Sequence, residues 1–341
     1  MPYDFVSAKT AALLAAKLSE AEACVAPKDS SLCRENAQNY LQSSTPSVSA
    51  TGSSMAGRRT VAILDAGSLQ STDISTPASM RLPVISVLYS PAQAKPGELH
   101  SAFYSLADSG CVMFSAENLQ ELMDLTMIAC RVSEDRKVLL PSVVQFDDPS
   151  LMEDASIPGD KVISAFLNNP ALPHRIDAKK PAALGGPSWE PALKMQHSKA
   201  MENAASLFKS SSETWNAKFR RSYGTIDNYK TEDADLILVM MGSHSATAKK
   251  AVDRARERGL RAGVARITMF RPFPYKELSE TLSSAKFSAT VDFSAPLGGK
   301  TPLQREAGTA ANFAVMKRPS EKDFEGMFAK LSREAKTHWV I

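Results

Sequence analysis

The stretch 231–274 reads TEDADLILVMMGSHSATAKKAVDRARERGLRAGVARITMFRPFP and contains a complete β–α–β unit. Residues 236–241 form a continuous apolar run, which is typical of a parallel strand that is buried on both faces. Residues 246–258 place alanine and valine on one helical face and charged side chains on the other. A second strand is expected over 264–270. The unit therefore predicts a parallel α/β fold with a right-handed crossover.

The ends of these elements carry their own signals. Gly242 and Ser243 end the first strand, and Ser243 or Ser245 is a plausible N-cap for the helix. Gly259 is a suitable stop for the helix, because glycine adopts the left-handed conformation without steric cost. Pro272 prevents the second strand from continuing.

Composition excludes several classes of protein. The chain has 341 residues, a formal net charge of +3 and 43% hydrophobic residues, as in an ordinary globular protein. Basic residues are scattered or mixed with acids, so no nucleic-acid-binding stripe is expected. The sequence has no run of about twenty apolar residues that would cross a membrane. We expect a cytoplasmic protein, with a mitochondrial location as the alternative.

The four cysteines are Cys24, Cys33, Cys111 and Cys130, and none of them forms a CxxC pair. Four thiols in a chain of this length suggest a reducing compartment. We interpret Cys24 and Cys33 as ordinary thiols, with a local disulfide as the alternative. An iron–sulfur cluster requires four thiolates at tighter spacing, and the histidines have no partners at metal-ligand spacing. We therefore expect no metal or cluster on this chain.

The same alternation of strands and helices extends over most of the chain. Strands are expected over 60–65, 84–89, 111–115, 137–146 and 287–293. Helices are expected over 7–22, 34–42, 117–133, 275–282 and 323–335. The Ser-rich stretch 43–54 is interpreted as a loop or linker. This alternation at these lengths predicts parallel sheets covered by helices.

Several blocks resemble the alpha subunit of 2-oxoacid (pyruvate):ferredoxin oxidoreductases. The most specific block is the run Phe270-Arg271-Pro272-Phe273-Pro274, and a second match is Gly242-Ser243 after the first strand. Upstream, residues 80–83 (MRLP), 116–124 (AENLQELMD) and 138–141 (VLLP) match in order. The resemblance covers residues 52–307, with a divergent and shortened N-terminal part.

The resemblance implies an α/β fold with two parallel-sheet domains. The first is a thiamine-diphosphate-enzyme pyrimidine-type domain, and the second is a transketolase C-terminal-like domain. We expect a divergent helical and linker segment over 1–50 and the pyrimidine-type domain over 51–150. A connector and helical bridge is expected over 151–230, and the domain II-like part over 231–341.

Several polar positions depart from what the resemblance implies. The family glutamate that hydrogen-bonds the thiamine ring should fall near residues 43–45, where this chain reads Ser-Ser-Thr, and the nearest acid is Glu35. Nothing matches the family's Tyr-Pro-Ile-Thr-Pro motif. The substrate-binding arginine should follow residues 84–89, where the chain continues with Ser90. The loop implied as Gly-Asp-His-x-Asp keeps His100 but has Ala102 in place of its second aspartate.

Few candidate site residues remain. His100 and Gln120 are the candidates for contacts with a cofactor, and no residue is singled out as catalytic. His244 follows a strand end, where ligands bind in α/β sheets, but a solvent-facing residue of the first helical turn is the favoured interpretation. Ser243 is interpreted as a cap and Arg271 as an anchor at a strand end. Residues 147–148 (Asp-Asp) are interpreted as a solvated loop.

Three functions are compatible with this pattern. We favour a non-catalytic or weakly catalytic component of a 2-oxoacid:ferredoxin oxidoreductase-type complex, acting mainly as a structural partner. A functional alpha subunit, which oxidatively decarboxylates a 2-oxoacid to an acyl-CoA, is the alternative. A decayed fragment or free-standing binding module is the third. The resemblance implies a hetero-oligomer with a beta-type thiamine-fold subunit and a ferredoxin-like subunit, in which thiamine diphosphate, Mg and iron–sulfur clusters are possible.

Overall fold

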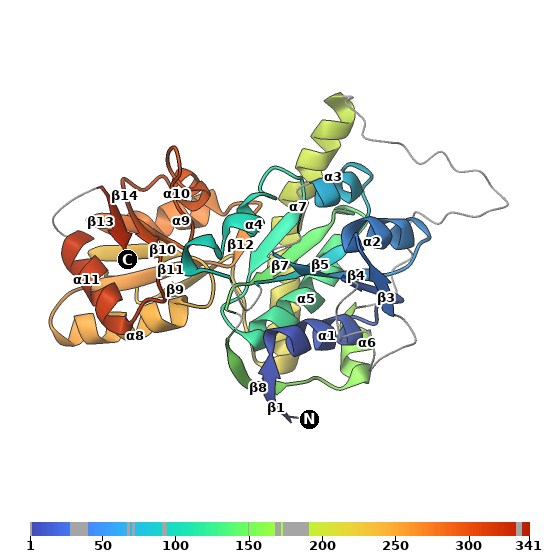
Figure 1. Ribbon diagram of the computed structural model, residues 1–341, viewed down its shortest axis with the longest axis horizontal. Helices are drawn as coiled ribbons and strands as arrows, with labels where there is room; N and C mark the ends of the chain where they lie inside the picture. Colours follow the sequence, from blue (N-terminus) through green and yellow to red (C-terminus); the bar gives the residue numbers. More distant parts are fainter. Residues whose placement is uncertain are drawn as a thin grey trace.

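The computed structural model describes residues 2–27, 40–66, 69, 72–90, 94–148, 150–167, 172, 191–331 and 336–341. Within these ranges the chain builds a seven-stranded sheet, a six-stranded sheet and a two-stranded sheet. Figure 1 shows the two large sheets in adjacent parts of the molecule, each with helices packed against it.

The seven-stranded sheet has the order β12-β6-β7-β5-β4-β2-β3. Its strands are β2 (Ala23–Pro27), β3 (Tyr40–Ser43), β4 (Thr60–Asp65), β5 (Ile85–Tyr89), β6 (Val112–Ser115), β7 (Ser142–Phe146) and β12 (Met269–Arg271). All neighbours are parallel except β12, which runs antiparallel to β6. The central strands are apolar and buried on both faces, as expected for parallel strands covered by helices.

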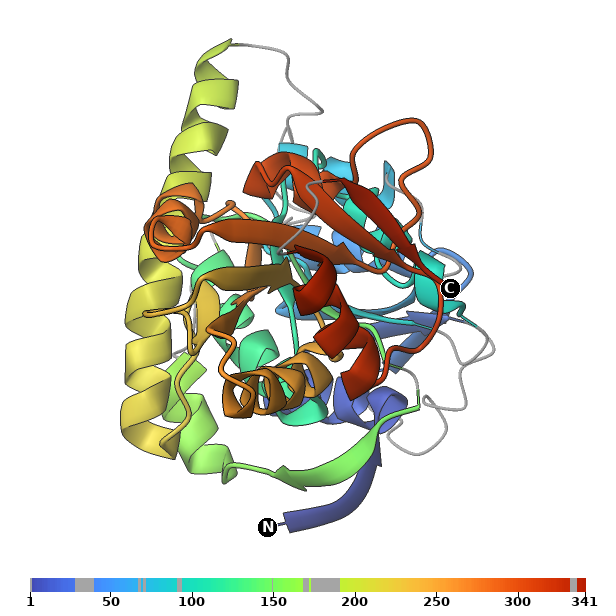
Figure 2. The same ribbon diagram turned by 90° about the vertical axis from the view of Figure 1, so that its left-hand side faces the viewer.

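Helices cover both faces of this sheet. One face carries α1 (Ala8–Leu18), α5 (Leu119–Ser133), α6 (Asp160–Leu167) and α7 (Pro191–Phe219). The other face carries α2 (Pro46–Met55), α3 (Thr72–Ser79) and the short α4 (Ser101–Tyr104), which follows the 3₁₀ turn η2 (Pro96–Glu98). The pair β1 (Pro2–Ser7) and β8 (Met152–Ser156) forms the separate antiparallel sheet. Figure 2 shows α7 running along one side of the molecule.

The six-stranded sheet has the order β15-β14-β13-β10-β11-β9. Its strands are β9 (Ile226–Tyr229), β10 (Leu236–Met240), β11 (Ala262–Ile267), β13 (Phe287–Asp292), β14 (Ala311–Val315) and β15 (Thr337–Val340). Only β9 runs antiparallel to its neighbour. The helices α8 (Ser245–Glu257) and α11 (Glu321–Leu331) pack together on one face. On the other face lie α9 (Tyr275–Leu282) and α10 (Pro302–Ala307).

The β–α–β unit predicted for residues 231–274 is present as β10, α8 and β11, and it differs from the sequence prediction in two details. The N-cap of α8 is His244, whose side chain makes no capping bond, rather than Ser243 or Ser245. The strand expected over 264–270 divides into β11 and β12, which join different sheets. The division occurs at Thr268, because the N–H groups of Thr268 and Met269 both donate to the carbonyl of Thr225, at 3.0 and 3.1 Å.

The largest differences from the sequence expectations lie before residue 56. The Ser-rich stretch 43–54, expected to be a loop, contains the helix α2. Its small side chains, including Ala50 and Ser54, are buried against β2 and β4, so packing outweighs a loop-like composition. The expected helix over 34–42 lies mostly outside the described residues, and Tyr40–Ser43 is the strand β3. The segment set apart as 1–50 thus supplies β2 and β3 to the first sheet.

Candidate functional site

The two large sheets meet at the carboxyl ends of their parallel strands. Asp147 follows β7 of the first sheet, and Ser243 follows β10 of the second. The backbone N–H of Ser243 donates to Oδ1 of Asp147 at 2.9 Å. Asp292 is the last residue of β13. Ligands of open α/β sheets bind outside the carboxyl ends of the strands, and here these ends of the two sheets contact each other directly.

His100 lies at the centre of this contact and is fully buried. Its Nε2 is 3.0 Å from Oδ2 of Asp147, and its Nδ1 is 3.3 Å from Oδ1 of Asp292. Each ring nitrogen thus faces a carboxylate oxygen, and this arrangement favours the imidazolium form, in which both nitrogens carry a proton to donate. Burial alone would lower the pKa of His100, but the hydrogen bonds to the two carboxylates outweigh it and raise the pKa to about 9.

The two carboxylates have further partners. The hydroxyl of Tyr104 donates to both oxygens of Asp292, at 2.9 and 3.0 Å. Burial alone would raise the pKa of Asp147, but the hydrogen bond from His100 and the positive charge of its ring hold that pKa below the ordinary value. We call His100, Tyr104, Asp147, Ser243 and Asp292 the His100 cluster. Its charges are paired and desolvated, which is the condition under which buried charges are tolerated.

Gly242 is required for this contact. Its φ of +79° lies in the left-handed region, and a Cβ added there would lie 1.9 Å from Oδ2 of Asp147.

The position of His244 differs from the sequence expectation. His244 is buried rather than solvent-facing, packs edge-on against Phe293 at 4.6 Å, and has its pKa lowered by burial. The reason is the second sheet's contact with the first, which local sequence does not reveal.

Residues 147–148, expected to be a solvated loop, are also buried. Asp148 accepts a hydrogen bond from Nη2 of Arg318 at 2.7 Å and another from the backbone N–H of Ser150 at 2.9 Å. Asp147 and Asp148 therefore point to different partners, as adjacent residues leaving a strand do. Both nevertheless contribute to the contact between the two sheets.

A second set of charges joins the sheets beside the His100 cluster. Arg266 of β11 is buried and donates to Oε1 of Glu121 at 3.1 Å and to Oδ2 of Asp227 at 3.2 Å. Lys249 of α8 lies 2.7 Å from carboxylate oxygens of Glu117 and Asp227. Glu117 follows β6, so this network also connects a carboxyl end of the first sheet with the first turns of α8.

The remaining candidate residues have structural contacts. Gln120 donates from Nε2 to Oδ1 of Asp124 at 2.9 Å and accepts from the backbone N–H of Ser156 at 2.7 Å, and no bond joins it to His100. Arg271 donates from Nη2 to Oε1 of Glu306 at 2.6 Å and from Nε to the carbonyl of Ala107 at 3.0 Å. Arg271 therefore ties β12 to α10 and to the end of the turn after α4.

The resemblance implies a ring-binding glutamate near residues 43–45, and Ser43 of this stretch is the last residue of β3. Its Oγ accepts hydrogen bonds from Oγ of Ser49 at 2.8 Å and from the backbone N–H of Thr45 at 3.1 Å. Glu35 lies outside the described residues. Asp65, at the end of β4, is an acid on this edge of the sheet, but it lies two strands away and thus about 10 Å across the sheet. The described residues therefore do not supply the carboxylate that thiamine activation requires at this position.

The structure also bears on metals, thiols and membranes. In the described ranges, no group of three or more His, Cys, Asp or Glu side chains is arranged to hold a metal ion. None of the helices there combines the length and hydrophobicity needed to cross a bilayer. Cys111 and Cys130 are buried thiols, and burial raises the pKa of Cys111 to about 11. Cys33, the possible partner of Cys24, lies outside the described residues.

Two family models match the chain, in the same order as its two sheets. "Pyruvate flavodoxin/ferredoxin oxidoreductase, thiamine diP-bdg" matches residues 47–216, and "Pyruvate:ferredoxin oxidoreductase core domain II" matches residues 234–322. The two large sheets thus belong to a thiamine-enzyme pyrimidine-type domain and a transketolase C-terminal-like domain. The fold therefore defines a two-domain α/β chain of the thiamine-diphosphate enzyme class.

Known proteins narrow this class. Pyruvate synthase subunit PorA of Pyrococcus furiosus is 37% identical over 232 residues, which cover 65% of this chain and 58% of that subunit. PorA of Thermotoga maritima is 31% identical over 286 residues, covering 79% of this chain and 71% of the subunit. The structural match to the 2-oxoglutarate:ferredoxin oxidoreductase of Magnetococcus marinus has a TM-score of 0.66 and 14% identity. It covers 98% of this chain and 62% of the oxidoreductase chain.

The chain belongs to the family of pyruvate (2-oxoacid):ferredoxin oxidoreductase alpha subunits. It spans little more than half of the length of the Pyrococcus subunit. The sequence singled out His100 as a cofactor candidate and Ser243 as a helix cap, whereas the structure places both in a buried cluster with Tyr104 and Asp292, which the sequence analysis did not single out. Asp292 could have been found from sequence, because it ends an expected strand and therefore lies at a carboxyl edge.

Proposed function

We propose that this chain is the alpha-type subunit of a multi-subunit complex that oxidatively decarboxylates a 2-oxoacid to an acyl-CoA. The observation that carries the proposal is the match to PorA of Thermotoga maritima, which is 31% identical over 286 residues and covers 79% of this chain. The His100 cluster agrees with this proposal, because its paired buried charges hold the two domains of the chain in direct contact.

The proposed complex contains a beta-type thiamine-fold subunit and a ferredoxin-like subunit. Thiamine diphosphate, Mg and iron–sulfur clusters belong to the assembly in this proposal, and this chain contributes a wall of the thiamine site. Its described residues at that wall are Ser43, Ser49 and Asp65, whose side chains can hydrogen-bond to a polar group.

A second candidate is a subunit of the same complex that takes no part in the chemistry. The Ser43–Ser49 hydrogen bond favours it, because two hydroxyls replace the carboxylate that the resemblance implies at the thiamine ring. A hydroxyl does not stabilise the protonated ring nitrogen as a carboxylate does, so cofactor activation would be lost at this site.

Co-purification and calorimetry test these candidates. The chain is co-expressed with the products of its neighbouring genes, and thiamine diphosphate is titrated with Mg into the purified complex and into the chain alone. Stoichiometric binding to the complex, abolished when Ser43 and Ser49 are replaced by bulky leucines, supports the alpha-type subunit. Failure of the chain to co-purify with any thiamine-fold partner would contradict both candidates.

A further inference from the structure

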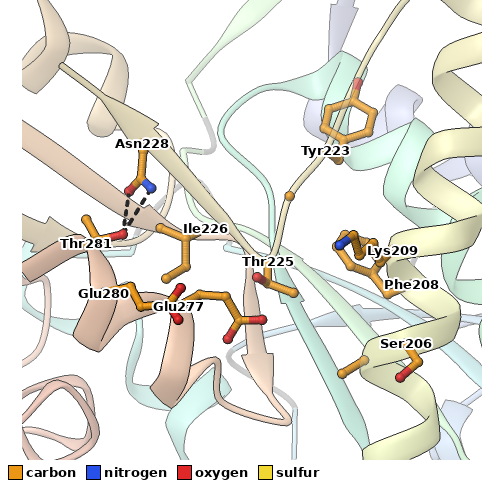
Figure 3. Close-up of a pocket in the computed structure, with 12 residues that line it drawn as sticks. Ser206, Phe208, Lys209, Tyr223, Thr225, Ile226, Asn228, Glu277, Glu280 and Thr281 are labelled. Carbon is orange, nitrogen blue, oxygen red and sulfur yellow. Dashed lines mark hydrogen bonds between the residues drawn. The ribbon is translucent and has the colours of Figure 1, made fainter. Parts of the chain in front are cut away.

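A groove of about 590 Å³ lies between α7, the connection 223–228 and α9. Its volume is within the range of small-molecule sites. Figure 3 shows its walls, with Ser206, Phe208 and Lys209 on α7 and Glu277, Glu280 and Thr281 on α9. None of the residues that line it belongs to the His100 cluster or to the edge around Ser43.

The bottom of the groove is held in place by buried neighbours. Phe208 is fully buried and packs against Phe114, with 5.1 Å between ring centroids. The hydroxyl of Tyr223, which also lines the groove, donates to Oδ2 of Asp124 at 2.7 Å, and this bond holds the ring in place. Half-buried Ile226 adds a further apolar surface. The groove therefore offers a fixed apolar surface between its two polar walls.

Each wall carries an exposed charged side chain that no described residue neutralises at close range. Lys209 and Glu277 make no hydrogen bond or ion pair with any residue in the described ranges, and Glu280 has only an exposed contact with Lys276 at 3.9 Å. The hydroxyl of Thr225, between the walls, also lacks a hydrogen-bond partner among the described residues. By contrast, Asn228 and Thr281 at one end already bond to each other at 3.0 Å.

We propose that this groove binds a linear zwitterion, with a carboxylate at one end, an ammonium at the other and an apolar body between them. The carboxylate pairs with Lys209, and the ammonium pairs with Glu277 and Glu280. The body lies on Tyr223 and Ile226, and Thr225 supplies a hydrogen bond. An ω-amino acid and a short peptide share this chemistry. Because α7 packs on the first sheet and α9 on the second, such a ligand would connect the two domains.

The test uses 6-aminohexanoate as the probe, with hexanoate and hexylamine as the compounds that each lack one charge. Binding to the full chain is measured by ligand-observed NMR at low and high salt. An exposed ion pair contributes up to about 1 kcal/mol, so each singly charged compound should bind about fivefold more weakly. High salt should reduce the difference, since exposed charges are screened.

Two variants assign the charges. In Lys209→Gln, 6-aminohexanoate should bind no more tightly than hexylamine. In the double variant E277Q/E280Q, it should bind no more tightly than hexanoate. Lys218→Gln, on the opposite face of α7, and Glu257→Gln, at the end of α8, are the matched controls and should bind as the wild type does.

The outcomes are distinct from those that test the proposed function, because no turnover or thiamine binding is measured. Equal binding of the three compounds by the wild-type chain, or no binding of 6-aminohexanoate, would overturn the proposal. The same loss of affinity in Lys218→Gln as in Lys209→Gln would also overturn it, since the effect would then reflect the net charge of the chain.

Discussion

Asp147 directly follows β7 of one sheet and Asp292 is the last residue of β13 of the other, and one imidazole ring lies between them. The ring belongs to His100, whose nitrogens are 3.0 and 3.3 Å from the two carboxylates. A single buried side chain thus connects the carboxyl ends of both sheets. Because each partner would be an unpaired buried charge without the others, the three residues should behave as one energetic unit.

Removal of the imidazole should therefore be costly. In His100→Ala, two buried carboxylates lose their shared cation, and we expect the free energy of unfolding to fall by about 3–5 kcal/mol. Urea denaturation followed by tryptophan fluorescence measures this loss. Glu257→Ala, an exposed position on α8, serves as the control. A loss of less than about 1 kcal/mol in His100→Ala would contradict a charged His100.

The same contact predicts a pH dependence. The pKa of His100 is raised from an ordinary value of 6.5 to about 9 in the folded chain. A raised pKa means that the folded state holds its proton more tightly. The stabilisation is therefore complete below pH 6.5 and is lost as the pH rises through 9. It amounts to about 3 kcal/mol, from about 1.4 kcal/mol per pH unit.

Thermal unfolding from pH 6 to pH 10 measures this effect. The wild-type Tm should fall over this interval, and His100→Gln should have a lower Tm at pH 6.5 and a Tm that changes much less with pH. Asp147 does not change charge in this interval, because its pKa is lowered. Its contribution to stability is present above its ordinary pKa of 3.8 and disappears only as the pH falls further. Parallel profiles for the wild type and His100→Gln would show that other groups cause the decline.

Gly242 and Gly259 form a matched pair for a steric prediction. Both have φ near +80°, but a Cβ at Gly242 would lie 1.9 Å from Oδ2 of Asp147, whereas nothing lies within 4 Å of one at Gly259. Gly259→Ala should cost only the backbone term, about 1 kcal/mol. Gly242→Ala should cost about 3 kcal/mol or more, because it also displaces Asp147 from His100. Equal losses, measured by urea denaturation, would mean that the two sheets do not contact each other at Asp147.

Arg271 should affect stability rather than turnover. In Arg271→Gln the hydrogen bonds to Glu306 and to the carbonyl of Ala107 are lost. We expect a decrease of about 1–2 kcal/mol in the free energy of unfolding, as for hydrogen bonds of partly exposed charged groups. Turnover of the assembled complex, compared per intact complex, should stay near the wild-type value. Normal stability with lost turnover would instead show that Arg271 takes part in the reaction.

Local sequence patterns predicted those elements in which the spacing of apolar residues alone determines which side chains are buried. The apolar run of β10, the two-faced helix α8 and the left-handed Gly259 follow from neighbouring residues alone. Contacts between distant parts are different. The buried positions of His244 and Asp148 depend on the docking of one sheet against the other, which no short window of sequence contains.

The helix α2 and the division of 264–270 were missed for the same reason. The serine, threonine and glycine residues of 46–55 favour a loop locally, but burial of small side chains against β2 and β4 stabilises a helix. The strand breaks at Thr268 because the carbonyl of Thr225, 43 residues earlier in the sequence, accepts two of its N–H groups. Neither effect can be read from propensities.

Turnover of the assembled complex shows whether this chain is the alpha-type subunit of a 2-oxoacid-oxidising enzyme. The complex obtained by co-expression with neighbouring gene products is given a 2-oxoacid, coenzyme A and a viologen dye. We expect dye reduction that requires the 2-oxoacid, coenzyme A and this chain together. If an intact complex reduces the dye equally well without this chain, the chain is not the alpha-type subunit.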